Sequence, residues 1–338
     1  MNARRLAEIT SRYALLRVAL IGDIALDRYL HIDSALEETS IETGLPVRNV
    51  VAVRPQPGAG GNVLANLAAL APKALAAVGF CGDDGEGFEL RRALESLGAD
   101  TSHFLLRPDR MTFTYTKPLI LRPGRPPEEL SRIDIRSRTP APAALEDEII
   151  AHLTSAVAAA DAVIAMDQVP EPGSGVLTRR VKAALADLAR ANPAKIFIAD
   201  SRTSIGEFAG VHIKVNAAEL ARHFGVTEQG ADVAALAARW SQEIGRHVFV
   251  TLSAEGILVA AADGKVTRIP GIPAAPPIDV TGAGDAVLAH IAMALAAGAT
   301  PAEAAELGNL AGAVVVKKIG TTGTATVEEL IAKLQPRS

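Results

Sequence analysis

A short segment near the carboxyl-terminal end, Asp279–Asp285 with the sequence DVTGAGD, has a composition suited to phosphoryl transfer. The stretch Ala286–Ala297 that follows is almost wholly apolar, so the sequence predicts a buried helix that begins in this segment. The first N–H groups of a helix bind anions such as phosphate, and Gly282 and Gly284 would leave them accessible. A carboxylate repels phosphate, but it can take the proton of an attacking hydroxyl. Asp285 is therefore a candidate catalytic base, or else it only stabilises the helix start.

A second glycine-rich turn, Gly58–Asn62 with the sequence GAGGN, precedes another helical pattern. Asn62 and Asn66 are four residues apart, so they share one face of the predicted helix. Two amides on one face suggest hydrogen bonds to a polyhydroxylated ligand. The alternative is that Asn62 caps the helix and Asn66 faces solvent.

Composition excludes several classes of protein. The 338 residues are 49% hydrophobic with a net charge of −4 and no basic run, so a nucleic-acid partner is not expected. One cysteine, Cys81, excludes a disulfide framework, and the seven histidines lack the paired spacing of a metal site. The longest apolar run, Ala286–Ala299, contains His290 and is shorter than the roughly 18 residues of a membrane span. We expect a cytoplasmic protein without a membrane partner.

Short apolar runs alternate with longer helical patterns along the chain. Because the runs are continuous rather than alternating, they favour strands buried on both faces, as in a parallel sheet covered by helices. The predicted strands are Val18–Gly22, Ala76–Phe80, Ala162–Met166, Ile196–Ala199, Ile213–Val215 and Val248–Thr251. The predicted helices between them include Glu86–Leu97, Ala144–Ala159 and Ala231–Ile244.

Polar residues stand at the ends of the predicted strands. They are Asp23, Asp167, Asp200, Asn216 and Ser253. Open α/β sheets bind ligands outside the carboxyl ends of their strands, and helix capping accounts for only one or two of these residues. The sequence therefore predicts a ligand site at this edge of the sheet.

Two other segments predict a small, half-exposed sheet. Thr112–Lys117 alternates between residue types with period two, and Pro46–Val53 is extended and rich in β-branched residues. Arg122–Leu130, with three prolines and a glycine, is predicted to be the loop between such strands.

Together these motifs resemble the ribokinase family of sugar kinases, also called the PfkB family. Both family signatures are present, the Gly58–Asn62 turn and the Asp279–Asp285 segment. Between them, Asn216–Glu219 resembles the family's Asn-x-x-Glu motif and Thr251–Gly256 resembles its nucleotide-binding turn. The resemblance implies one kinase domain over residues 1–338: an α/β three-layer sandwich with a central, mostly parallel sheet, and a β-strand lid inserted at about residues 28–57 and 110–136.

The resemblance also implies roles for individual residues. Asp285 would be the base, with Gly282, Ala283 and Gly284 as the anion hole. The residues that would hold ATP are Asn216, Thr251, Ser253, Gly256 and Asn309, with Glu219 organising Mg²⁺ through water. Sugar contacts would come from Asp27, Gly58, Asn62 and, as a weaker candidate, Asp23, with Arg132 reaching in from the lid. Asp279 and Thr281 would hold a monovalent cation such as K⁺, and the lid would form a homodimer interface.

Within the family, Gly22–Tyr29 and Arg132–Asp134 resemble the heptose-7-phosphate kinases of lipopolysaccharide precursor synthesis. Likeness at Ser40–Glu42 and Pro46–Val47 extends this through the predicted lid. Several basic residues of that group are replaced here. Asp200-Ser201-Arg202 stands for Asp-Pro-Lys, Glu38 aligns with a lid arginine, and Gln168–Gly175 contains no lysine. The sequence thus predicts an ATP-dependent kinase for a sugar or sugar phosphate, and these losses favour a substrate other than the 7-phosphate.

Three alternatives remain at this point. A nucleoside kinase of the same family would need an aromatic pocket, whereas aromatic residues make up 4% of the chain. A nucleotide-binding oxidoreductase built on Gly58–Gly61 is disfavoured because the nearest acidic residues, Asp83 and Asp84, fall in a turn. A protein that binds sugar or nucleotide without catalysis would retain the same motifs.

Overall fold

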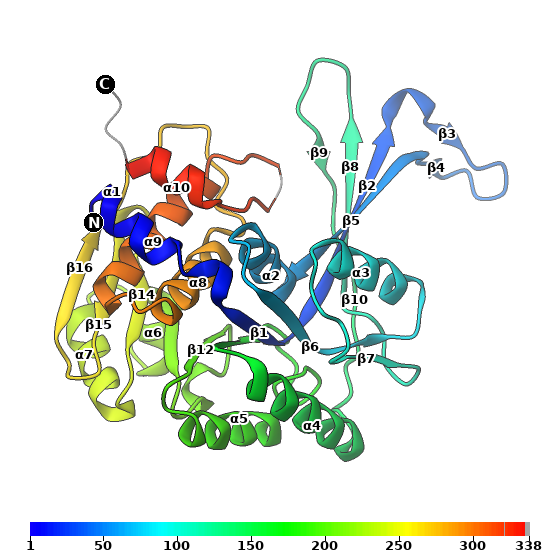
Figure 1. Ribbon diagram of the computed structural model, residues 1–338. Coiled ribbons are helices and arrows are strands. Elements are labelled where there is room, and N and C mark those ends of the chain that lie inside the picture. Colours follow the sequence, from blue (N-terminus) through cyan, green and yellow to red (C-terminus); the bar gives the residue numbers. More distant parts are fainter. Residues whose placement is uncertain (321, 335–338) are drawn as a thin grey trace.

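The computed structural model describes residues 1–320 and 322–334. A nine-stranded β-sheet lies at the centre of the protein (Figure 1). Its strands follow the order β16-β15-β14-β13-β12-β11-β1-β6-β7. Their bounds are β1 Arg17–Gly22, β6 Ala74–Gly82, β7 Phe104–Arg107, β11 Ala162–Asp167, β12 Ile196–Ser201, β13 His212–Asn216, β14 Val248–Thr251, β15 Gly256–Ala260 and β16 Val266–Pro270. The pairs from β7 to β14 are parallel, and β15 and β16 are antiparallel at one edge. The predicted α/β class with a mostly parallel sheet is confirmed.

Helices cover both faces of this sheet. One face carries α1 Ala3–Thr10, α2 Gly60–Ala69, α3 Gly85–Ser96, α8 Ala283–Ala296, α9 Pro301–Val315 and α10 Val327–Leu334. The other carries α4 Ala143–Ala159, α5 Arg179–Ala191, α6 Ala217–His223 and α7 Val233–Ile244. Because each strand presents apolar side chains to both layers, the sheet divides the interior into two hydrophobic cores.

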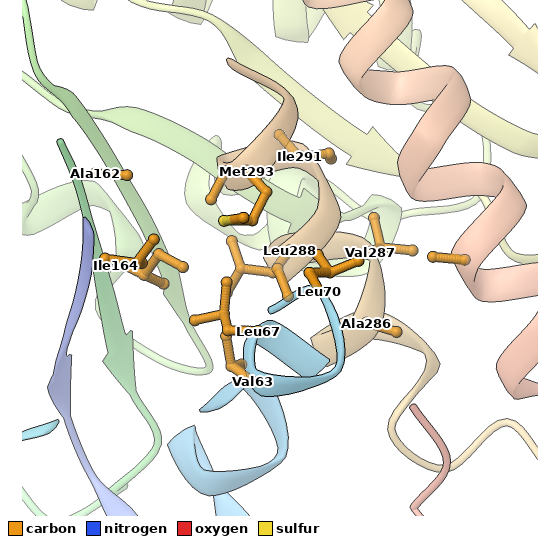
Figure 2. Close-up of a cluster of buried hydrophobic side chains, with 14 of the residues drawn as sticks. Val63, Leu67, Leu70, Ala162, Ile164, Ala286, Val287, Leu288, Ile291 and Met293 are labelled. Carbon is orange, nitrogen blue, oxygen red and sulfur yellow. The ribbon is translucent and has the colours of Figure 1, made fainter. Parts of the chain in front are cut away.

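Helix α8 is deeply buried in the hydrophobic core. Its residues from Ala286 to Leu295 are all buried, which confirms the predicted buried helix. Figure 2 shows Leu288 and Met293 of α8 beside Leu67 of α2 and Ile164 of β11. Burying each such side chain contributes about 1.5–3 kcal/mol, so the position of the α8 N-terminus is fixed by its packing.

A second, small sheet projects from the main body (Figure 1). Its strand order is β10-β8-β2-β5, and β9 also pairs with β8. The bounds are β2 Ile24–Asp33, β5 Val50–Ala59, β8 Thr114–Leu121, β9 Glu128–Glu129 and β10 Ile133–Ile135, with a separate hairpin of β3 Glu38–Thr39 and β4 Pro46–Val47. A single residue, Asp23, separates β2 from β1, so the small sheet grows directly out of the main one.

The small sheet differs in detail from the prediction. Thr112 and Phe113 precede β8 rather than belonging to it, because Thr112 is bound to Asp84 at the start of α3. Pro46–Val53 is divided between β4 and β5, and Arg122–Leu130 contains the short strand β9 as well as loop. The strand β2 begins at Ile24, four residues before the lid insertion that the resemblance implies at about residue 28.

Candidate active site

A cavity of about 320 Å³ lies where the carboxyl ends of the main strands face the small sheet. Most of its lining is polar or charged. The lining residues are Asp27, Ala59, Asn62, Tyr115, Lys117, Arg132, Gln168, Asp200, Arg202, Lys214, Glu219, Thr281, Gly282, Gly284, Asp285 and Thr322. The structure therefore brings both glycine-rich motifs and the small sheet to one site.

The N-terminus of α8 forms one wall of this cavity. Gly282 caps the helix with φ +77°, a left-handed conformation that suits glycine. The N–H of Ala283 donates to the carbonyl of Val280 at 3.2 Å. Within residues 1–320 and 322–334, the N–H groups of Gly282, Gly284 and Asp285 have no recorded acceptor. These three groups, rather than the N–H of Ala283, are available to an anion.

Asp285 lies in the first turn of α8 and lines the cavity. Its Oδ2 accepts a hydrogen bond of 3.2 Å from the amide of Asn62, at the start of α2. Burial raises the pKa of Asp285 to about 6, and the nearby Asp200 adds to this, whereas Lys214, Asn62 and Arg202 act in the opposite direction. A base whose pKa lies just below neutral is ionised at neutral pH and can still accept a proton readily.

Beneath α8 lies an ion pair that the sequence analysis did not single out. Nζ of Lys214 on β13 lies 2.5 Å from Oδ2 of Asp200 on β12, and both side chains are buried. Burial lowers the pKa of Lys214, but the carboxylates of Asp200, Glu219 and Asp285 more than reverse this effect and raise it. The signal was a lysine between Ile213 and Val215 in a strand predicted to be buried on both faces.

The small sheet contributes the opposite wall. Asp27 on β2 pairs with Lys117 on β8 at 2.9 Å, and Lys117 also donates to the hydroxyl of Tyr29 at 3.3 Å. An ideal Cβ at Gly58 would lie 2.7 Å from Cγ of Asp27, so glycine is needed there for Asp27 to reach its position. Gly58 thus shapes the wall, and Asp27 lines the cavity as expected.

Arg132 also lines this wall. Its guanidinium stacks on the ring of Tyr115 at 4.2 Å and forms two hydrogen bonds, of 2.6 and 2.8 Å, with Asp134. Glu38, which aligns with a lid arginine of the heptose kinases, does not line this wall and accepts a hydrogen bond from Asn49 beside the exposed β3–β4 hairpin.

Arg202 follows β12 and lines the cavity from the main body. Its side chain is exposed, and no carboxylate partner is recorded for it in the described part of the chain. Lys117, Arg132 and Lys214 are each paired with an aspartate, so Arg202 is the cation of this cavity with its charge least compensated.

Two residues that the sequence suggested as sugar contacts, Asp23 and Asn66, bind the protein backbone and do not line the cavity. The buried carboxylate of Asp23 accepts three backbone N–H bonds of 2.8–2.9 Å, from Gln168, Val169 and Val176, and it does not line the cavity. The prediction that Asp23 contacts sugar is therefore not supported. Asn66 binds the backbone at Asn62 and Ala325, so of the two predicted amides only Asn62 faces the site.

Asp167 is occupied as well. Its carboxylate lies 3.0 Å from Nζ of Lys182 on α5 and accepts bonds from the hydroxyls of Ser201 and Ser204. Lys182 therefore does not replace, in the cavity, the lysine that Gln168–Gly175 lacks. Its ammonium group is paired with Asp167 and does not line the cavity.

The residues expected to hold a nucleotide lie along the sheet edge beside the cavity. Asn216 and Thr251 are register partners at the ends of β13 and β14, and Asn216 caps α6 in a capping box with Glu219. Ser253 begins the short helical turn before β15, and Gly256 begins β15 itself with φ +99°. Asn309 on α9 donates to the carbonyl of Pro270 at 2.7 Å. Of this group, Glu219 alone is among the residues that line the main cavity.

Asp279 holds together the turn before α8. Its carboxylate accepts the N–H of Thr281 at 2.9 Å and the N–H of Gly320 at 3.2 Å. Lys317 donates to the carbonyls of Ala275 and Pro277 in the same loop. Thr281 lines the cavity, whereas Asp279 stands behind it.

Residues 1–320 and 322–334 contain neither a cluster of metal ligands nor a membrane-spanning helix. No group of three or more histidine, cysteine, aspartate or glutamate side chains is arranged to hold a metal ion. No helix in that part of the chain has the length and apolar character needed to cross a membrane.

The fold and the cavity define an α/β protein with a helix N-terminus and a carboxylate at the centre of its site. Residues 183–328 match the family described as pfkB family carbohydrate kinase. It is 32% identical over 321 residues to the bifunctional protein HldE of Azorhizobium caulinodans, covering 94% of this chain and 64% of the relative. HldE of Trichlorobacter lovleyi is 30% identical over 98% of this chain and 65% of its own length. The chain thus spans just under two thirds of these relatives.

Solved structures confirm the ribokinase-like fold. The ribokinase of Arabidopsis thaliana, solved with ribose and ATP, has a TM-score of 0.67 at 20% identity and covers 95% of this chain and 99% of its own. A nucleoside kinase of Burkholderia thailandensis, solved with inosine, has a TM-score of 0.60 at 19% identity, covering 94% and 97%. At these identities the likeness concerns the fold alone.

Proposed function

We propose that the protein transfers the γ-phosphoryl group of ATP to a hydroxyl of a sugar or sugar phosphate, as a kinase of the heptose-7-phosphate kinase type. The observation that carries the proposal is the position of Asp285, within one polar cavity and beside three N–H groups of the α8 N-terminus that have no acceptor among residues 1–320 and 322–334. The HldE relatives, which extend over nearly the whole chain, support the same assignment.

In the proposed reaction Asp285 accepts the proton of the sugar hydroxyl while the hydroxyl oxygen forms a bond to the γ-phosphorus. The bond from that phosphorus to the β,γ-bridging oxygen breaks, and ADP leaves with the electron pair. The N–H groups of Gly282, Gly284 and Asp285 would stabilise the negative charge on the transferred group. Asn62 orients the Asp285 carboxylate through their 3.2 Å hydrogen bond.

Two metal ions would assist this reaction. Mg²⁺ would neutralise charge on the ATP phosphates, and Glu219 would help to hold it through water with a carboxylate oxygen, the kind of ligand that this ion prefers. Burial, reinforced by Asp200, raises the pKa of Glu219, as expected for two carboxylates near one site. A monovalent cation such as K⁺ would be held by Asp279 and Thr281 in the turn before α8, where it would add positive potential.

The state of the substrate depends on two opposing observations. Similarity to HldE favours a phosphorylated heptose, whereas only Arg202 among the four lining cations is free of an aspartate partner. A phosphate carries close to two negative charges and is normally held by several cations. The deciding measurement is kcat/KM for heptose 7-phosphate against unphosphorylated hexoses and pentoses, in the wild type and in Arg202→Ala.

The first experiment is ATP consumption with this panel of sugars. We expect turnover with at least one of them and none with Asp285→Asn. Consumption of ATP with nucleosides alone would favour the nucleoside kinase, although Tyr115 is the one aromatic residue recorded in the cavity lining. ATP and sugar binding without turnover would favour the non-catalytic alternative.

We further propose that two copies pair through the far face of the small sheet. Strand register places Leu30, Val53 and Pro118 on one face, opposite the face that bears Asp27, Tyr29 and Lys117. The far face carries an open, largely apolar groove of about 480 Å³, and Val53 and Ile133 beside it are 44% and 60% exposed. An exposed apolar sheet face is typical of an interface, and a second copy offers a matching one.

A further inference from the structure

The Asp200–Lys214 pair is not required by the fold in the way that a helix cap is. Lys214 stands between Ile213 and Val215 in β13, and its side chain is 6% exposed. A charged pair in such a place is costly to bury, and replacing it with apolar residues of similar volume is often neutral or stabilising. Its presence therefore suggests a role in the site.

Lys214 lies directly beneath the first turn of α8. An ideal Cβ placed on Gly284 would lie 3.2 Å from Nζ of Lys214, closer than almost all real contacts of this kind. Glycine at position 284 thus leaves room for the ammonium group, and both residues line the cavity. The positive charge lies on the same wall as Asp285 and the free N–H groups of the helix.

We propose that Lys214 is the fixed cation of this site: Asp200 holds it beneath the first turn of α8, where it stabilises the Asp285 carboxylate and the negative charge of the transferred phosphoryl group. The proposal rests on the kinase function proposed above. It assigns Lys214 a positioning role, because its side chain acts through Asp285 and through the electrostatic potential of the anion site. Unlike a bound metal ion, this charge is present whether or not ATP is bound.

The other charged groups around Asp285 determine what removal of Lys214 would do. Asp200, Glu219 and Arg202 lie on the same side of the cavity, and Asp27, Lys117 and Arg132 line the opposite wall. Asp27–Lys117 and Arg132 with Asp134 are pairs of opposite charge. Lys214 and Arg202 act to keep Asp285 ionised, while Asp200 acts against it.

The test is the pH dependence of kcat/KM in three variants. Lys214→Met removes the charge and should move the acidic limb upward by about one pH unit or more, because a carboxylate that loses a cation within the site is harder to ionise. Asp200→Asn leaves the ammonium in place and should move the limb downward. Lys214→Arg should restore most of the wild-type profile.

Lys182→Met is the matched control. Lys182 is also buried, 6% exposed, and paired with an aspartate, Asp167, but it does not line the cavity. It should lose stability much as Lys214→Met does and keep the wild-type pH limb. A limb that moves equally in both lysine variants would overturn the proposal, as would Lys214→Met and Asp200→Asn shifts of the same sign.

A second readout separates this proposal from the kinase assignment. Titration of the Asp285 carboxyl carbon by NMR, assigned with Asp285→Asn, needs no turnover. If its midpoint moves upward in Lys214→Met while no sugar is phosphorylated by the wild type, the kinase function fails and the role of Lys214 in Asp285 ionisation stands. If the wild type is active and the midpoint does not move, the Lys214 proposal is wrong.

Discussion

Ionised Asp285 destabilises the folded protein, because burial disfavours the charged carboxylate. Its pKa rises from 3.8 to about 6 on folding, chiefly because of burial. The folded state therefore binds an extra proton between these two pH values, and the free energy of unfolding falls as the pH rises through this window. Such a carboxylate is typical of a functional site rather than of a helix cap.

We predict that Asp285→Asn loses turnover by about 100-fold or more, since an amide cannot accept the hydroxyl proton. The same variant should keep ATP affinity and gain about 1 kcal/mol or more in free energy of unfolding at pH 7.5, because position 285 then no longer carries a desolvated charge. Urea unfolding at pH 7.5 and pH 5 checks this, and the gain should be smaller at pH 5. Near wild-type turnover would reduce Asp285 to a residue that stabilises the helix.

The wild-type enzyme should also show an acidic limb in its pH profile. Because burial and Asp200 raise the pKa of Asp285 to about 6, kcat/KM should fall tenfold per pH unit below that value. The measurement is kcat/KM from pH 5 to 9 at saturating Mg²⁺. A profile flat down to pH 5 would mean that Asp285 does not act as the base.

A third prediction at this scale concerns the monovalent cation. Asp279 connects Thr281, in the turn before α8, with Gly320 after α9, so an ion beside it would order both segments. We expect higher kcat or ATP affinity in potassium than in sodium at constant ionic strength, and the difference should disappear in Asp279→Asn. Equal kinetics in both salts would remove the cation proposal and leave the kinase proposal in place.

Individual residues were predictable from sequence where a motif named them. Asp285 and Asn62 follow recognisable glycine-rich turns, Asp27 belongs to the segment Gly22–Tyr29 that carries the family resemblance, and all three line the cavity. Lys214 was missed, and Asp200 was noted only as a residue at a strand end, because their pairing depends on how the neighbouring parallel strands β12 and β13 align. The sugar contact predicted for Asp23 stays a prediction without support from the cavity lining, because a polar residue after a strand can equally bind the neighbouring loop, as Asp23 does.

At the scale of elements, continuous apolar runs predicted six of the seven parallel strands and missed β7, a four-residue strand at the sheet edge that is only partly buried. The strands β15 and β16 were missed because Gly256–Ala260 follows β14 after only four residues and was read as part of a nucleotide-binding turn. The small-sheet strands were harder because their two faces differ: β2 presents Asp27 and Tyr29 to the cavity and Leu30 to the far side. Its pairing with β8, far along the chain, has no local signal.

The small sheet should close over the sugar. Beyond the packing of Ile24 and Leu26 in the main core, the polar contacts to the main body in the described residues include the hydrogen bond of 2.6 Å from Gln56 to Thr322 and the Arg28–Glu89 ion pair. Such a sheet has little core of its own, so its amides should exchange readily without ligand. We predict slower hydrogen exchange in β5 and β8 when sugar is added, with β13 and α8 unchanged as internal controls. Equal exchange with and without sugar would contradict closure, unless the dimer already protects these strands.

At the scale of the whole molecule, the two faces of the small sheet differ in polarity and would bind different partners. The cavity face is polar and suited to a sugar, whereas the far face exposes Val53 and Ile133 around its groove. Apolar surface of this kind favours association, and a twofold axis would let the same residues cover each other. Dimerisation and substrate closure would then use opposite faces of one element.

We predict that the 35.1 kDa chain sediments as a dimer of about twice that mass at micromolar concentration. Val53→Lys should give the monomer, because a lysine on the far face would be buried without a partner charge. Val226→Lys is the matched control: Val226 is 45% exposed, close to the 44% of Val53, but lies after α6 and away from the small sheet. A wild type that sediments as a monomer, or equal dissociation in both variants, would exclude this interface. Hydrogen exchange in the Val53→Lys variant separates dimerisation from closure. If this variant is monomeric, its β5 amides should exchange faster than those of the wild type when no sugar is present. If added sugar still slows their exchange, dimerisation and closure protect the small sheet independently.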